Sequence, residues 1–173
     1  ETDQILEITG VLNGTTNYVL GRVEGGESFG EAVRRAQAAG FAELDPSRDL
    51  DGRDAGDKLC VLAQEAWGIA INPASIEREA LSEASIAKAL AACRPGEAVR
   101  HIATIARAQD GRISAAVRIQ RVATNGPLGR AEREWNVVIV RTMAGEPIVV
   151  SGRGAGRWPT AESVIADALE CIS

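Results

Sequence analysis

The sequence predicts an α+β domain with a mixed, mostly antiparallel sheet and helices on one face of it. Apolar residues recur at helical spacing between glycine stops in the first half, and β-branched stretches alternate with tight turns in the second half. Turns of two residues join neighbouring strands in antiparallel fashion, so the second half should form hairpins rather than βαβ units. A length of 173 residues suits one such domain with a buried core.

The first half should begin with a strand and continue mainly as helices. Ser28 and Glu31 have the spacing of a capping box, and Gly40 and Gly68 are typical of helix ends. The expected elements are a strand over Ile5–Leu12, a helix from the Asn13–Asn17 turn to Gly25, a helix from Ser28 to Gly40, a loop over Leu44–Gly52, a helix over Arg53–Trp67 and a helix over Glu79–Cys93.

The second half should supply most of the sheet. Asp110-Gly111 and Ala144-Gly145 are typical hairpin turns. His101 stands alone in an apolar run, so we expect a packed strand residue rather than a ligand. The expected strands are Val99–Arg107, Ile113–Arg121, Trp135–Thr142 and Glu146–Ser151, with a further helix from about Thr160.

Composition narrows the function classes. A net charge of −5 without a basic run argues against nucleic-acid binding, and no apolar run approaches a membrane span of about 20 residues. Cys60, Cys93 and Cys171 are odd in number and far apart, which favours reduced thiols in the cytoplasm over a disulfide framework. No zinc-type spacing is present, so no metal is expected. The chain starts at Glu1 without methionine, and we expect a part of a larger polypeptide.

One stretch has an unusual density of charge. Six acidic residues crowd the fifteen positions before Lys58, which is one of only two lysines in the chain. Lysine can give up a proton in a shielded site, whereas arginine cannot, so Lys58 is a candidate proton donor. On a helix it should lie beside the apolar stripe, half-buried and one turn after Asp54. The acidic residues are Glu43, Asp45, Asp49, Asp51, Asp54 and Asp57.

A less specific interpretation of this stretch stays open. Charge runs usually form solvated surfaces, and Asp54–Lys58 has the spacing of an ordinary ion pair on a helix. A calcium loop is a poor fit, because Gly52 comes too early and Cys60 stands where the closing glutamate belongs.

Two glycine-containing turns are further candidates for ligand contact. The strand-to-helix turn around Gly14 and Thr15 offers free N–H groups that suit a carboxylate, although Asn13 or Thr15 could simply cap the helix. The run over 152–156 permits close backbone approach to a ligand. It is not a dinucleotide fingerprint, because Arg157 takes the place of the third glycine.

Three stretches closely resemble homoserine dehydrogenases, in the order in which that family has them. The resemblance implies interconversion of L-aspartate 4-semialdehyde and L-homoserine with NAD(P), in threonine and methionine biosynthesis. It implies that residues 1–173 are a substrate-binding and catalytic domain, without the N-terminal Rossmann domain that binds most of the cofactor. The stretches are GVLNGTTNYVL at 10–20, GFAELDPSRDLDGRDAGDKLCVLA at 40–63 and GRGAGRWPTAESVIAD at 152–167.

The same resemblance assigns roles to single residues. Lys58 and Asp54 match the catalytic lysine and carboxylate. Gly154 and Ala155 match the segment that faces the nicotinamide end of the cofactor. A homodimer formed through the sheets is also implied. The positions that match substrate ligands are Gly14, Thr15, Glu43 and Asp49.

The chain departs from the family pattern at two places. Phe41 stands where the family typically has tyrosine, and Ala131–Glu134 lacks a glycine that often precedes the asparagine matching Asn136. Phe41 keeps open a dehydrogenase-like paralogue for another small amino or hydroxy aldehyde. A non-catalytic ligand-binding or dimerisation module is a third possibility, which the presence of Lys58 disfavours.

Overall fold

One six-stranded sheet forms the centre of the molecule in a computed structural model that describes residues 5–132 and 135–153. The strand order is β2-β4-β3-β1-β5-β6, and only the β2–β4 pair is parallel. This confirms the expected α+β class with a mixed, mostly antiparallel sheet. The strands are β1 (Ile5–Val11), β2 (Glu77–Arg78), β3 (Glu97–Arg107), β4 (Ile113–Ala123), β5 (Trp135–Thr142) and β6 (Ile148–Arg153).

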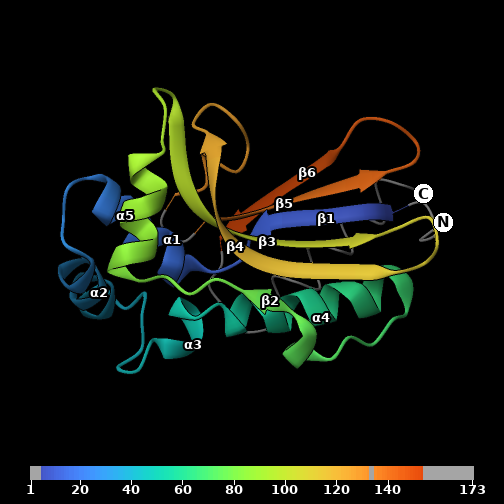
Figure 1. The fold of residues 1–173 in the computed structure, drawn as a ribbon, viewed down its shortest axis with the longest axis horizontal. Coiled ribbons are helices and arrows are strands. Elements are labelled where there is room, and N and C mark those ends of the chain that lie inside the picture. Colours follow the sequence, from blue (N-terminus) through green and yellow to red (C-terminus); the bar gives the residue numbers. More distant parts are fainter. Residues whose placement is uncertain (1–4, 133–134, 154–173) are drawn as a thin grey trace.

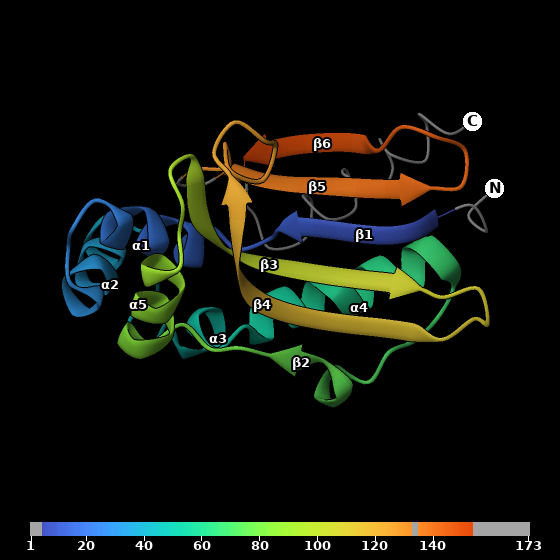
Figure 2. The same ribbon diagram turned by 45° about the horizontal axis from the view of Figure 1, so that its top comes forward.

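The longest described helix covers one face of this sheet, and most of the others gather at one end. Figures 1 and 2 show α4 running along the strands, with α1, α2 and α5 beside the end where β1 leads into α1. The helices are α1 (Gly14–Glu24), α2 (Phe29–Ala38), α3 (Ser47–Leu50), α4 (Arg53–Trp67) and α5 (Glu83–Ala91), with a short 3-10 turn η2 (Pro73–Ser75).

The main core lies between α4 and the sheet. Leu59 and Leu62 of α4 are buried against a sheet face that includes Ile8, Ile105 and Val138. Burying one such side chain stabilises the fold by about 1.5–3 kcal/mol. These strand positions follow the alternation of a pleated sheet, and the α4 positions follow the 3.6-residue period, which is why both elements were predictable.

The described residues cover the opposite face of the sheet only in part. A smaller cluster of Val11, Ile102, Ala131 and Val137 packs there. Trp135 is 40% exposed and lines a hollow of about 310 Å³ beside β5 and β6. The described helices therefore leave apolar surface open on this face.

Two sequence predictions were wrong in detail, one short strand was missed, and the strand expected over Glu146–Ser151 lies two residues later, at Ile148–Arg153. The Leu44–Gly52 segment is not all loop, because Asp49 and Leu50 donate backbone hydrogen bonds to Pro46 and close the helical turn α3. The helix expected from Glu79 begins only at Glu83, after Ser82 and Ser85 form a capping box. The backbone N–H of Glu79 instead donates to Val117 of β4, which continues the pairing of the unpredicted strand β2.

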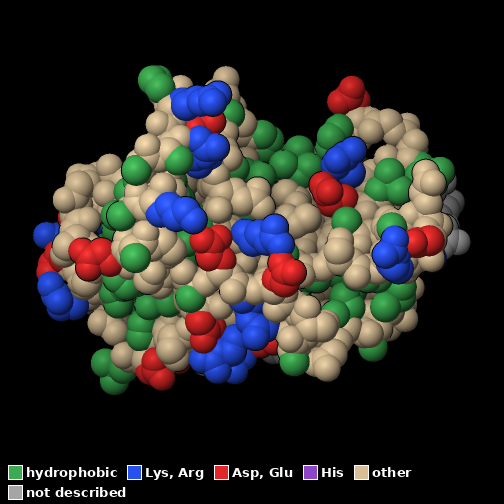
Figure 3. All heavy atoms as spheres, in the orientation of Figure 1, with side chains coloured by type: hydrophobic (Ala, Val, Ile, Leu, Met, Phe, Trp, Pro, Cys, Tyr) green, Lys and Arg blue, Asp and Glu red, His purple; other side chains and the backbone are tan. Residues whose placement is uncertain are grey.

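The charged side chains of the surface are mixed in sign. On the face shown in Figure 3, acidic and basic groups lie among one another without a large patch of either sign. Among the described helices, none has the length and apolar character needed to cross a membrane.

Candidate functional site

The candidate site lies where the turn after β1 meets the start of α4. Asn13 has extended backbone angles of φ −135° and ψ 118°, and its Oδ1 accepts a hydrogen bond from Thr16 N at 2.9 Å. This is the usual N-cap arrangement, and it starts α1 directly after the strand. Asn13 is only 6% exposed, so its side-chain amide points into the protein.

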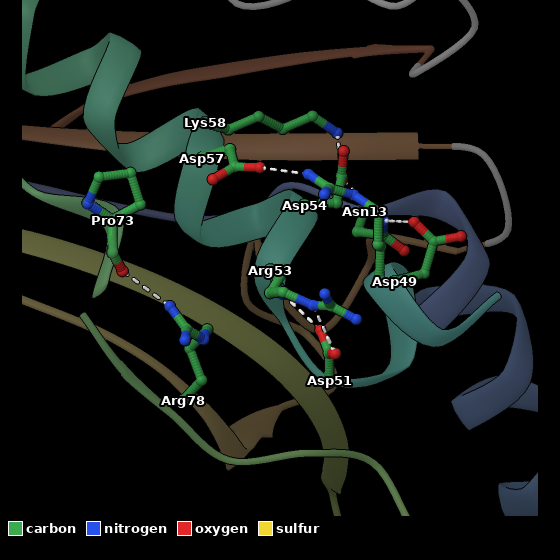
Figure 4. Close-up of polar contacts among 10 residues, drawn as sticks. Asn13, Asp49, Asp51, Arg53, Asp54, Asp57, Lys58, Pro73 and Arg78 are labelled. Atoms are coloured by element: carbon green, nitrogen blue, oxygen red, sulfur yellow. Dashed lines mark hydrogen bonds and ion pairs between the residues drawn. The ribbon is translucent and has the colours of Figure 1, made fainter. Parts of the chain in front are cut away.

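The amide group of Asn13 joins two of the predicted site residues. Its Nδ2 donates to Asp49 Oδ1 at 2.7 Å and to Asp54 Oδ2 at 2.8 Å (Figure 4). Asp49 comes from α3 and Asp54 from the first turn of α4, so three separate elements meet at one nitrogen atom. From the sequence, Asn13 was expected only as a helix cap, since nothing in its spacing indicates the two carboxylates.

Lys58 lies beside this cluster, half-buried as its helical position predicts. Its Nζ donates to Asp54 Oδ2 at 2.7 Å and to the backbone oxygen of Leu12, also at 2.7 Å. The side chains of Lys58 and Asp54 are 33% and 34% exposed. An ammonium group has three donors, and these contacts use two of them. The amine is therefore fixed by the protein while its remaining donor can serve a ligand.

The other acidic residues of the stretch have structural partners. Asp51 pairs with Arg53 at 2.7 Å (Figure 4), and Asp57 pairs with Arg48 of α3 at 2.6 Å. Asp45 accepts a hydrogen bond from the backbone of Ser47, and this bond lowers the pKa of that carboxyl group. The stretch thus divides into surface contacts that shape α3 and α4 and an inner pair, Asp49 and Asp54, at the site.

The predicted substrate ligands before α3 lie in two connected segments. Gly14 is the first residue of α1, and the Thr15 hydroxyl donates to the backbone oxygen of Phe41 at 2.5 Å. The ring of Phe41 stacks on Tyr18 with centroids 4.5 Å apart. Glu43, two residues after Phe41, has an exposed side chain. The Thr15–Phe41 contact thereby ties the Glu43 segment to the start of α1.

The start of α4 is set by a close contact with the sheet. Gly52 has φ +80°, and a Cβ atom there would lie 3.2 Å from Val117 Cγ1 and 3.3 Å from His101 Cε1. His101 is 4% exposed, and its Nε2 lies 2.9 Å from the backbone oxygen of Glu79. Burial lowers the pKa of His101 to about 4. His101 is therefore a packed, neutral strand residue, as predicted, and it supports the backbone that leads into α4.

Some predicted features cannot be placed. Gly154 and Ala155, the helix from Thr160 and Cys171 lie outside the described residues. In the part of the chain that is described, no group of three or more histidine, cysteine or acidic side chains could hold a metal ion. Cys60 and Cys93 are free thiols, and burial raises the pKa of both.

Comparisons with known proteins agree with the family resemblance of the three sequence stretches. The profile of the family described as homoserine dehydrogenase matches residues 1–169. The chain is 35% identical to a homoserine dehydrogenase from Synechocystis over 98% of its own length and 40% of that protein. It is also 35% identical to an NAD(+)-dependent homoserine dehydrogenase from Pseudomonas canavaninivorans, over 92% of its length and 46% of that protein.

Solved structures give the same result for the fold. The crystal structure of Staphylococcus aureus homoserine dehydrogenase at pH 6.5 matches 97% of this chain with a TM-score of 0.83 and 27% identity. A hyperthermophilic archaeal homoserine dehydrogenase mutant in complex with NADPH matches 96% of it with a TM-score of 0.72 and 28% identity. The chain spans 42% and 47% of the lengths of those two proteins. On the match of the family profile and of these relatives, the chain belongs to the homoserine dehydrogenase family.

Proposed function

We propose that this chain is the substrate-binding and catalytic domain of an enzyme that interconverts L-aspartate 4-semialdehyde and L-homoserine. One observation supports this most directly: Lys58 Nζ is held between Asp54 and the end of β1 with a donor to spare. An ordinary surface ion pair on a helix would not need the backbone oxygen of Leu12 as a second acceptor. The proposal extends to the whole enzyme, because the chain spans less than half of each relative.

The substrate would lie across the turn before α1 and the Glu43 segment. Homoserine has an amine and a carboxylate at one end and a hydroxyl group at the other. Glu43 would pair with the amine, and the N–H groups at Gly14 and Thr15 would receive the carboxylate at the positive end of α1. Asp49 would orient the substrate toward Lys58.

Lys58 would handle the proton of the reaction. In reduction, NAD(P)H supplies a hydride to the aldehyde carbon. Lys58 Nζ would give a proton to the aldehyde oxygen as its negative charge develops, which yields the hydroxyl group of homoserine. In the reverse direction the uncharged amine would accept that proton. Asp54 would hold the Nζ atom in place in both directions.

Most of the cofactor would be bound outside the described residues. Among the described strands only β2 and β4 pair in parallel, whereas a dinucleotide-binding fold is built on a mostly parallel sheet. We propose that a Rossmann domain elsewhere in the enzyme binds NAD(P), with Gly154 and Ala155 facing its nicotinamide end. Relatives are named with NAD(+) and with NADPH, so we propose the class NAD(P).

A homodimer and a cytoplasmic location are part of the proposal. The open face of the sheet carries Trp135 at 40% and Val149 at 47% exposure beside a hollow of about 310 Å³. Such apolar surface favours a protein contact, and a second copy of the chain fits the resemblance. Light scattering should report about twice the mass of one chain. A single-chain mass over a wide concentration range would contradict the dimer.

The free thiols of Cys60 and Cys93 support a reducing compartment, which is the reason for the proposed cytoplasmic location.

Lys58→Arg in the full-length enzyme tests the catalytic role. Arginine keeps the charge but not the transferable proton, so kcat should fall at least about a hundredfold, with cofactor binding nearly unchanged. Lys88→Arg is the matched control, since Lys88 is the chain's other lysine and is exposed on α5. Its kcat should stay at the parent value. A Lys58→Arg enzyme within about threefold of the parent kcat would return the Asp54–Lys58 contact to an ordinary ion pair.

A further inference from the structure

We propose that Asn13 is a positioning residue that holds Asp49 and Asp54 together and thereby sets the place of Lys58. The inference rests on the proposed function for its catalytic consequence. Its geometric part rests only on the contacts of one buried amide. Asn13 is 6% exposed and makes three side-chain hydrogen bonds between 2.7 and 2.9 Å long.

Capping alone does not explain asparagine at this position. The cap uses only Oδ1, which accepts from Thr16 N, and serine or aspartate would cap about equally well. The Nδ2 group adds two donors, and each is directed at a different carboxylate, Asp49 and Asp54. Serine has no such pair of donors, and aspartate has none when ionised. Among the usual capping residues, asparagine is thus the one that both caps α1 and bridges the two acids.

The two hydrogen bonds from Asn13 Nδ2 to Asp49 and Asp54, called the bridge below, reduce the repulsion between the two carboxylates. Two carboxylate oxygens lie within 2.8 Å of one nitrogen atom, and like charges this close repel each other. Donors shared between them stabilise both negative charges. Without the amide, the two side chains would separate or share a proton. Either change would alter the carboxylate oxygen that holds the amine of Lys58.

The bridge also links Asp49, the proposed substrate-binding residue, to Lys58, the proposed proton donor. Asp54 Oδ2 accepts from both Asn13 Nδ2 and Lys58 Nζ. The second acceptor for Lys58 is the backbone oxygen of Leu12, the residue directly before Asn13. Leu12 thus holds Lys58 directly, and Asn13 holds it through Asp54. A shift of Asp49 on substrate binding would reach Lys58 through the same amide.

Asn13→Ser in the full-length enzyme tests this role in catalysis. Serine keeps the cap, so the fold should survive, but the two donors are lost. We expect kcat to fall at least about tenfold, and the midpoint of the acidic limb of the pH–rate profile to move upward. The matched control is Asn72→Ser, because Asn72 also caps a helical turn through Ala74 N but is exposed and bonds to Ala74 and Ser75 rather than to this network. The control should match the parent in both measurements. An Asn13→Ser enzyme within twofold of the parent kcat and with an unmoved midpoint overturns the inference.

Asn13→Asp should change the pH dependence of activity in the direction opposite to Asn13→Ser. The new carboxyl group keeps the size and the cap, but it donates a hydrogen bond only when it is protonated. Its residual activity relative to the parent should therefore rise as the pH falls. A constant ratio across the pH range contradicts a donor role.

The bridge can also be observed without catalysis. In protein labelled with ¹⁵N-asparagine, the side-chain amide signals of Asn13 should shift in both Asp49→Asn and Asp54→Asn, while those of Asn72 stay in place. Unshifted Asn13 signals in both variants overturn the inference even if Asn13→Ser does not fold. Shifted Asn13 signals together with a fully active Lys58→Arg enzyme would instead keep the bridge and reject the proposed role of Lys58.

Discussion

α2 and α4 each carry an acidic residue in the first turn and a basic residue four positions later, in different surroundings. Glu31 and Arg35 of α2 are four residues apart, as are Asp54 and Lys58 of α4. The α2 pair has a long contact of 3.4 Å between side chains that are 41% and 53% exposed. The α4 pair has a contact of 2.7 Å, and its members also bind Asn13 and the backbone of Leu12.

The difference shows that spacing creates an ion pair while the surrounding structure gives it a role. Arg35 can exchange Glu31 for Glu27 or for water, because Glu27 lies 3.3 Å from the same nitrogen. Arg35 is 53% exposed, and ion pairs of such exposed side chains contribute roughly 0.2–1 kcal/mol to stability. Besides its own carboxylate, Lys58 has a fixed partner from a second element, the backbone oxygen of Leu12 after β1. A fixed amine with an unused donor suits a ligand, whereas an exchangeable arginine suits a solvated surface.

Removing the acid of each pair should give the largest difference between the two helices. In the full-length enzyme, Asp54→Asn should lower kcat by about a hundredfold or more, because Lys58 loses its charged partner and the bridge loses one acceptor. Glu31→Gln should leave kcat unchanged. Steady-state kinetics at saturating substrate measures both. Equal effects of the two variants would mean that the α4 pair has no special function.

His101, which lies against the start of α4, should make the stability of the protein depend on pH. The pKa of His101 is lowered to about 4 from its ordinary value near 6.5, because burial disfavours the charged ring. The stabilising contribution of the neutral ring is therefore complete above about pH 6.5 and is lost as the pH falls toward 4. The loss between pH 7 and pH 5 should be about 2 kcal/mol.

Urea unfolding at the two pH values measures this loss. His101→Gln is the matched variant, since glutamine keeps a donor for the backbone oxygen of Glu79 but does not titrate in this range. The part of the pH dependence that comes from this residue should disappear. An identical pH dependence in parent and variant would show that His101 is not the source.

Glycine-to-alanine changes at the two helix starts should have opposite signs. Gly52→Ala should destabilise the protein by about 1–3 kcal/mol, because the left-handed φ of +80° is strained for alanine and the new methyl group meets Val117 and His101. Gly30→Ala in α2 should stabilise it by about 0.5–1 kcal/mol, since that position is exposed and only Arg34 lies near. Thermal unfolding of both variants measures the two shifts. A stabilising Gly52→Ala would contradict the close approach of α4 to the sheet.

Arg35→Ala should have the smallest effect. Arg35 is 53% exposed and its contacts with Glu27 and Glu31 are long, at 3.3 and 3.4 Å, so the free energy of unfolding should fall by less than about 0.5 kcal/mol. The small loss should shrink further in 1 M salt, where charges are screened within about 3 Å. A loss above 2 kcal/mol would show that the α2 pair is not the exchangeable surface contact described here.

The sequence determined the elements that follow a regular apolar period. α4 was predicted with its observed bounds, and β5 likewise, because burial on one face imposes a 3.6- or 2-residue repeat that can be counted along the chain. β2 and α3 were missed because each is too short to show a period, and both depend on contacts with distant residues or on a local turn. The predictions of a loop over Leu44–Gly52 and of a helix that starts at Glu79 were wrong for this reason.

Asp49, Asp54 and Lys58 were predicted one by one as site residues, but their arrangement around Asn13 depended on tertiary structure. Asn13 lies 36 residues from Asp49 and 41 from Asp54, and no periodicity links such distant positions. Charge and spacing did not separate these two acids from Asp51 and Asp57, which have the same chemistry and only different partners; only the family resemblance singled them out. A hydrogen bond requires two atoms within about 3 Å, and only the packing of α1, α3 and α4 around the end of β1 brings Asn13 within that distance of both acids.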